Sequence, residues 1–140
     1  VTTALGLLLA PIVGGVFALP IYLFAVELIQ GTLHASSLGR DLFGTAQIGA
    51  YFGGMMGVIP AFLLGWPVHV ALLRTHMTNL LSYIVFGAVI GFVSFFITAP
   101  IFGFGNVLSS SVLEMSPVAA LCGAFGGLVF WPIRRPDRGP

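Results

Sequence analysis

Four long stretches of this 140-residue chain contain no charged side chain, and this feature limits the fold more than any other. They cover residues 1–26, 42–73, 75–113 and 115–133. About 20 mostly apolar helical residues are needed to cross the ~30 Å hydrocarbon core, because a helix rises ~1.5 Å per residue. A helix also satisfies its own backbone hydrogen bonds, which lipid cannot do. The stretches therefore predict an all-α integral membrane protein with four transmembrane helices.

The composition excludes most soluble classes of protein. Hydrophobic residues make up 58% of the chain and charged residues 6%, with a mean hydropathy of +1.09. Soluble domains have about 25% charged residues. The net charge of +1 cannot neutralise a run of phosphates, so we expect no nucleic-acid partner. We expect one transmembrane domain, residues 1–140, in the inner (cytoplasmic) membrane of a bacterium, with the lipid bilayer as its surroundings.

Prolines, glycines and polar residues set the expected limits of the helices. We expect helices over about residues 4–28, 45–72, 78–99 and 116–133. External loops are expected over about residues 31–43 and 100–115. Kinks are expected at Pro11 and Pro20, inside the first helix, because proline removes a backbone donor.

Two helix starts have a recognisable pattern of residues. Thr78 or Asn79 can cap the third helix, since both side chains accept a hydrogen bond from a free backbone N–H. Ser116 followed by Pro117 has the pattern of an N-cap and a first helical position. We therefore expect the fourth helix to begin there.

The distribution of arginine predicts the orientation in the membrane. In a four-helix topology, the turn after the second helix and the C-terminal segment lie on one side. The arginines of that side are Arg74, Arg134, Arg135 and Arg138. The opposite side has one arginine, Arg40, beside Asp41. Because arginine is enriched in cytoplasmic segments, we predict that both termini are cytoplasmic.

Small residues recur at four-residue intervals along the expected helices. They are Gly49, Gly53, Gly57, Ala61 and Gly65 in the second helix, Gly87 and Gly91 in the third, and Gly123 and Gly127 in the fourth. This spacing lets helix backbones approach closely, which favours association in lipid. We predict a compact four-helix bundle packed through these glycine faces, as in a glycine zipper. Packing within the chain is the favoured role of the second-helix stripe, and contact with another subunit is the alternative.

Polar side chains that could do chemistry are scattered. Glu27 is the one acid inside an apolar run, and an ionisable group at membrane depth is a functional candidate. It lies near the outer end of the first helix, so we favour a solvated interfacial acid over a coupling group. His69 and His76 are two helical turns apart, about 10 Å, too far to share a metal ion. We predict no metal site and no cofactor, although one interfacial histidine allows contact with lipid, a pigment or a quinone.

Two functions remain after this survey. The sequence contains no glycine-rich phosphate loop, paired catalytic carboxylates or metalloprotease motif, so we predict that the chain is not an enzyme. The first function is a non-catalytic accessory subunit that packs into a larger membrane protein complex, such as an energy-converting complex. The alternative is a small transporter or channel that forms a homo-oligomer and uses Glu27 as its coupling group. The scarcity of ionisable residues in the helices favours the accessory subunit, because a transport pathway usually has several.

Overall fold

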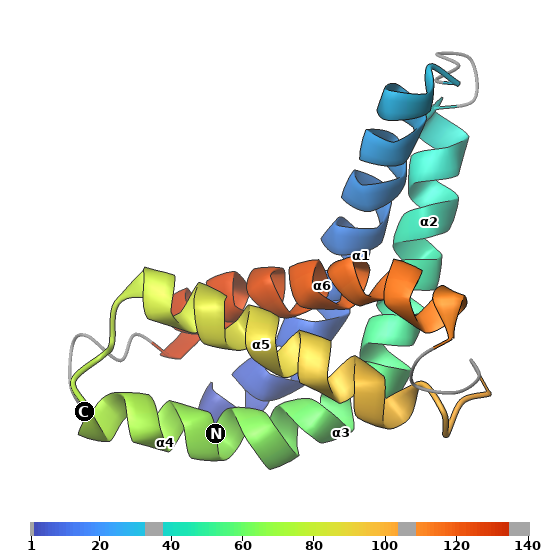
Figure 1. Cartoon of the computed structure of the whole chain (residues 1–140). Coiled ribbons are helices and arrows are strands. Elements are labelled where there is room, and N and C mark those ends of the chain that lie inside the picture. Colours follow the sequence, from blue (N-terminus) through green and yellow to red (C-terminus); the bar gives the residue numbers. More distant parts are fainter. Residues whose placement is uncertain (1, 33–37, 104–108, 135–140) are drawn as a thin grey trace.

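A computed structural model describes residues 2–32, 38–103 and 109–134, and this part of the chain is almost entirely helical (Figure 1). Four helices are long and apolar enough to cross a membrane. The predicted all-α class with four helices of membrane length is therefore confirmed. Arg135 and Arg138, which contribute to the predicted orientation, lie outside the described residues, as do parts of both predicted loops.

Three of the long helices are α1 (Thr2–Gln30), α5 (Leu80–Thr98) and α6 (Ser110–Arg134). The remaining long helix runs without interruption over residues 38–74. Its consecutive segments are α2 (Leu38–Phe52), η1 (Gly53–Gly57), α3 (Val58–Pro60), η2 (Ala61–Gly65) and α4 (Trp66–Arg74), of which η1 and η2 are π-helical.

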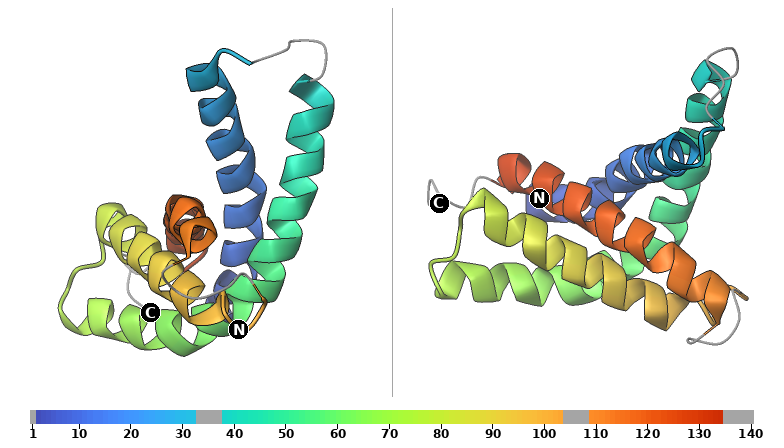
Figure 2. Two further views of the ribbon diagram at one scale, coloured as in Figure 1. Left: turned by 45° about the vertical axis from the view of Figure 1, so that its right-hand side comes forward. Right: turned by 45° about the horizontal axis from the view of Figure 1, so that its top comes forward.

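The long second helix changes direction between α2 and α4 (Figures 1 and 2). Pro60 has no N–H to donate to the carbonyl of Met56, and the two π-helical segments lie on either side of it. Prolines and π-helical turns are the usual causes of helix bending. Kinks were predicted at Pro11 and Pro20; α1 is α-helical through both residues, and Figure 1 shows that its two halves differ in direction, so this helix also bends without a break.

This bend divides the molecule into an arm and a body. The arm consists of the C-terminal half of α1, which ends at Gln30, together with α2, and it projects away from the rest in every view (Figures 1 and 2). The body consists of the N-terminal half of α1 with α4, α5 and α6. Helix α6 packs against both α5 and α1. This shape differs from the predicted compact bundle, because the turn near Pro60 carries α4 away from the direction of α2.

The start of α5 agrees with the sequence and the start of α6 does not. Asn79 caps α5, and its side chain accepts a hydrogen bond of 2.8 Å from the Ser82 N–H. Ser116 is not an N-cap, because α6 begins at Ser110. Pro117 cannot donate to the Leu113 carbonyl, and the Ser116 hydroxyl donates to that carbonyl instead, at 2.8 Å. The serine thus lets the helix continue through the proline.

The second helix also begins earlier than predicted, at Leu38 rather than near residue 45. Asp41 lies in its first turn, where a negative charge interacts favourably with the helix dipole. The Thr45 hydroxyl donates to the Asp41 carbonyl at 2.8 Å. Polar residues assigned to a loop from the sequence therefore form the first turns of the arm.

A cavity between the helices as the candidate functional site

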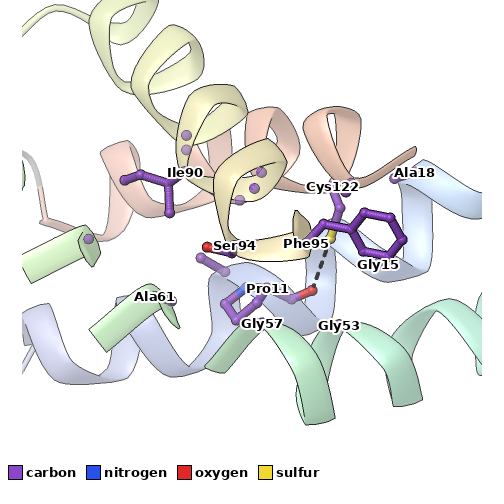
Figure 3. Close-up of a pocket in the computed structure, with 18 of the residues that line it drawn as sticks. Pro11, Gly15, Ala18, Gly53, Gly57, Ala61, Ile90, Ser94, Phe95 and Cys122 are labelled. Carbon is purple, nitrogen blue, oxygen red and sulfur yellow. Dashed lines mark hydrogen bonds between the residues drawn. The ribbon is translucent and has the colours of Figure 1, made fainter. Parts of the chain in front are cut away.

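A cavity of about 390 Å³ lies where the four long helices meet, and we call it the central cavity. Its walls include Pro11 of α1, Gly57 and Ala61 of the second helix, Ser94 of α5 and Cys122 of α6 (Figure 3). Small-molecule sites in proteins have volumes of about 300–1,000 Å³ and mostly apolar walls. The central cavity has this size and this kind of lining.

Glycines on the second helix bring its backbone against α1. A Cβ added to Gly49 would lie less than 3.0 Å from the carbonyl oxygen of Gly15, and one added to Gly53 would lie as close to the Pro11 carbonyl. A Cβ on Gly57 would lie 2.6 Å from the Pro11 Cβ. Real Cβ atoms essentially never approach so closely. The predicted stripe therefore faces another helix of the same chain.

The two remaining members of the stripe have looser surroundings. A Cβ on Gly65 would meet only the Leu7 Cδ2 atom, at 2.9 Å, which is the end of a flexible side chain. Ala61 lies in the wall of the central cavity. The contact between the stripe and α1 is thus tightest beside the arm and opens toward α4.

Helices α5 and α6 also touch through glycine. A Cβ on Gly87 would lie less than 3.0 Å from the Gly123 carbonyl oxygen, and a Cβ on Gly123 would lie as close to the Gly87 carbonyl oxygen. A Cβ added to Gly91 would lie less than 3.0 Å from the Ala119 carbonyl oxygen, and a Cβ added to Gly127 would lie as close to the Tyr83 carbonyl oxygen. All these neighbours are backbone atoms, which cannot rotate away. The same small residues leave space beside the contacts, and this space contributes to the cavity.

An aromatic and histidine cluster forms part of the cavity wall. His69 of α4 is 4% exposed, and its Nδ1 atom lies 2.8 Å from the hydroxyl of Tyr83 of α5. The ring of Phe130 packs edge-on against His69 at 5.1 Å and stacks on Tyr83 at 5.8 Å. Beside this cluster, the Trp131 Nε1–H donates to the Thr78 carbonyl at 2.8 Å. His69 therefore joins α4 to α5 rather than facing the membrane surface, whereas His76 is exposed in the turn after α4.

Ser94 is the most unusual polar residue in the cavity wall. Its side chain is 5% exposed, and its Oγ atom has no hydrogen-bond partner among the described residues. Figure 3 shows the Ser94 oxygen near the labelled residues Pro11 and Ala61, and all three residues line the cavity. Cys122 also lines the cavity, and its thiol donates to the Pro11 carbonyl at 3.6 Å. Ser94 was not among the candidate residues predicted from the sequence, although it lies one turn after Gly91 on the face that carries Gly87.

Glu27, the predicted ionisable candidate, lies in the arm and not in the central cavity. It shares a small pocket of about 30 Å³ with Asp41 and Thr45. None of the described residues that line the central cavity is aspartate, glutamate, lysine or arginine. No group of three or more His, Cys, Asp or Glu residues that could hold a metal ion occurs in the described part of the chain.

No protein-family model, curated protein or solved structure matches this chain. Two features of its own residues bear on function. One is an arm with exposed apolar side chains; the other is a cavity whose described lining contains no Asp, Glu, Lys or Arg and includes the Ser94 hydroxyl, which has no partner among the described residues.

Proposed function

We propose that this chain is a non-catalytic integral membrane subunit that packs into a larger membrane complex through its arm. Both termini lie in the cytoplasm in this proposal, because the arginine-rich segments favour that side. Glycine contacts between the helices hold the subunit together. The observation that carries the proposal is that exposed apolar side chains at the end of the arm lie beside charged residues, Glu27 and Asp41.

Large apolar side chains and charges lie side by side at the end of the arm. Leu28, Ile29 and Phe43 are 62%, 85% and 66% exposed. Glu27 and Asp41 are their close neighbours in sequence, and these charges require water or lipid headgroups. Removing the water-exposed surface of such a side chain from water is worth about 25 cal/mol per Å², whereas surface that is already covered by lipid gains nothing from the hydrophobic effect. A partner subunit that covers the apolar side chains and leaves the carboxylates at its rim would gain this free energy.

The lining of the central cavity favours this function over the transporter alternative. Ion pathways are usually lined by rings of carbonyl groups or by charged side chains. The wall of the central cavity consists mainly of glycine and apolar side chains, and Glu27 lies in the arm. A substrate ion in the central cavity would therefore lose its hydration without gaining a counter-charge.

Site-specific photo-crosslinking tests this function. A photoreactive phenylalanine analogue is placed at Phe43 of the arm or, as the control, at Phe92 of α5, which is 42% exposed. Irradiation in native membranes should join Phe43, but not Phe92, to one membrane protein of different sequence. An adduct between two copies of this chain would favour the homo-oligomer instead. Lipid adducts alone at both positions would contradict the proposed function.

A further inference from the structure

The unpaired hydroxyl of Ser94 needs an explanation, because a buried polar group without a partner is costly. A serine within a helix can donate to the carbonyl four residues earlier, which here belongs to Ile90. Thr98, one turn further along α5, makes this bond, and its hydroxyl donates to the Ser94 carbonyl at 2.8 Å. Ser94 makes no such bond within the described chain. The Ser94 Oγ atom is almost fully covered by the cavity wall, so a small shift of the wall lets its hydroxyl bond a molecule that enters the cavity.

The cavity follows the length of α5 rather than forming a round chamber. The α5 residues that line it recur every three or four positions from Tyr83 to Thr98. Fifteen residues of helix correspond to about 22 Å. Apart from the polar groups already described, the walls along this distance are glycine, alanine and larger apolar side chains. A long, narrow and apolar occupant fits this shape.

We propose that the central cavity binds a lipid-soluble molecule with a long apolar chain and a neutral carbonyl group, whose oxygen accepts a hydrogen bond from Ser94. The apolar walls contact the chain, and the absence of charged residues among the described lining excludes a charged head at this position. The hydroxyl proton needs an acceptor, and a carbonyl oxygen is the common acceptor of neutral lipids. This site is independent of the arm and goes beyond the proposed role in assembly.

Two kinds of membrane molecule share this chemistry. An ester of a fatty acid has an acyl chain next to a carbonyl oxygen, and a prenyl quinone has an isoprenoid chain next to a ring carbonyl. Both reach the cavity from the bilayer and are already out of water, so the hydrogen bond to Ser94 forms without competition from solvent. One photoreactive probe of each kind distinguishes the two sources.

The test uses photoreactive probes on the full chain in lipid nanodiscs. The probes are a long-chain acyl ester and a prenyl benzoquinone, each with a diazirine in its chain, and an ether of equal chain length without a carbonyl. At least one carbonyl probe should label the protein saturably, with adducts on cavity residues such as Ile90. Ser94→Ala should raise the half-saturating concentration of that probe roughly 3- to 10-fold, the value of one net hydrogen bond. The same substitution should not change the labelling by the ether.

Matched variants separate the site from general effects on the fold. Ser82→Ala removes another buried hydroxyl from α5, outside the cavity, and should leave all labelling unchanged. Ala61→Leu places a larger side chain in the cavity and should reduce labelling by every probe at least about tenfold. Ala71→Leu, on the exposed side of α4, is its control. Ser94→Ala keeps the proposal testable should Ala61→Leu misfold.

The pattern of labelling decides both the proposal and the source. Labelling by the ester alone indicates an acyl lipid, labelling by the quinone alone indicates a quinone, and labelling by both supports recognition of the shared carbonyl and chain. Labelling that does not saturate, or that falls on outward-facing residues such as Val89, would overturn the proposal. Equal affinity of the carbonyl probes for the native chain and Ser94→Ala would also overturn it.

Discussion

Adding one methyl group to Gly123 should separate α5 from α6, and the size of the effect follows from the contact. A Cβ at this position would lie 2.9 Å from both the Gly91 Cα and the Gly87 carbonyl carbon. Carbon atoms pack at about 3.5–4.0 Å, so the helices must move apart by roughly 1 Å. Overpacking of this kind costs about 1–3 kcal/mol. We therefore expect Gly123→Ala to destabilise the protein although alanine favours the helix.

Gly44→Ala is the matched control, because a Cβ added there has no neighbour within 4 Å. Both substitutions gain the same helix propensity, about 0.5–1 kcal/mol. The difference between the two variants therefore measures the steric cost alone, about 1–3 kcal/mol. It can be measured by reversible unfolding in mixed micelles with increasing SDS, followed by far-UV circular dichroism. Equal free energies of unfolding for Gly123→Ala and Gly44→Ala would refute the close contact between α5 and α6.

Three further predictions concern the aromatic and histidine cluster, the arm and the orientation of the chain in the membrane. Tyr83→Phe removes the hydroxyl paired with His69 and should lower the free energy of unfolding by about 1–3 kcal/mol in the same assay; an unchanged value would argue against the buried pair. Glu27→Gln should leave complex assembly unchanged, and a pH-dependent flux in liposomes that this variant abolishes would support the transporter instead. Cysteines at Thr32 and His76, in a variant without the native cysteine, should react with an impermeant thiol reagent from the outside and the cytoplasm respectively; reaction from one side only would contradict the topology.

The helices were predictable where hydropathy and local caps determine them. The third predicted helix, residues 78–99, agrees closely with α5, because Asn79 caps it whatever surrounds it. The predicted start of the fourth helix, at Ser116, was wrong, because a serine followed by a proline can occur either at the start of a helix or inside one. Inside α6, the Ser116 hydroxyl donates to the Leu113 carbonyl, which Pro117 leaves without a partner. This bond depends on the rotamer of Ser116, which the sequence pattern does not specify.

The candidate site was predictable only in part. The spacing of Gly49, Gly53 and Gly57 predicts a close approach to another helix, but it does not tell which helix or whether space remains beside it. The bend near Pro60 depends on two π-helical segments, for which the sequence has no comparable signal. Ser94 could have been selected as a polar residue on the glycine face of the third helix. Its missing hydrogen bond is evident only in the packed structure.

Native mass spectrometry of the protein isolated from its own membranes in mild detergent tests the central claim most directly. We predict a complex in which this chain is present in a fixed ratio with at least one subunit of different sequence. Substituting the arm residues Ile29 and Phe43 with serine should release the chain from that complex while leaving it folded. Recovery of the native chain alone, with bound lipid but without a second kind of subunit, would contradict the proposed function.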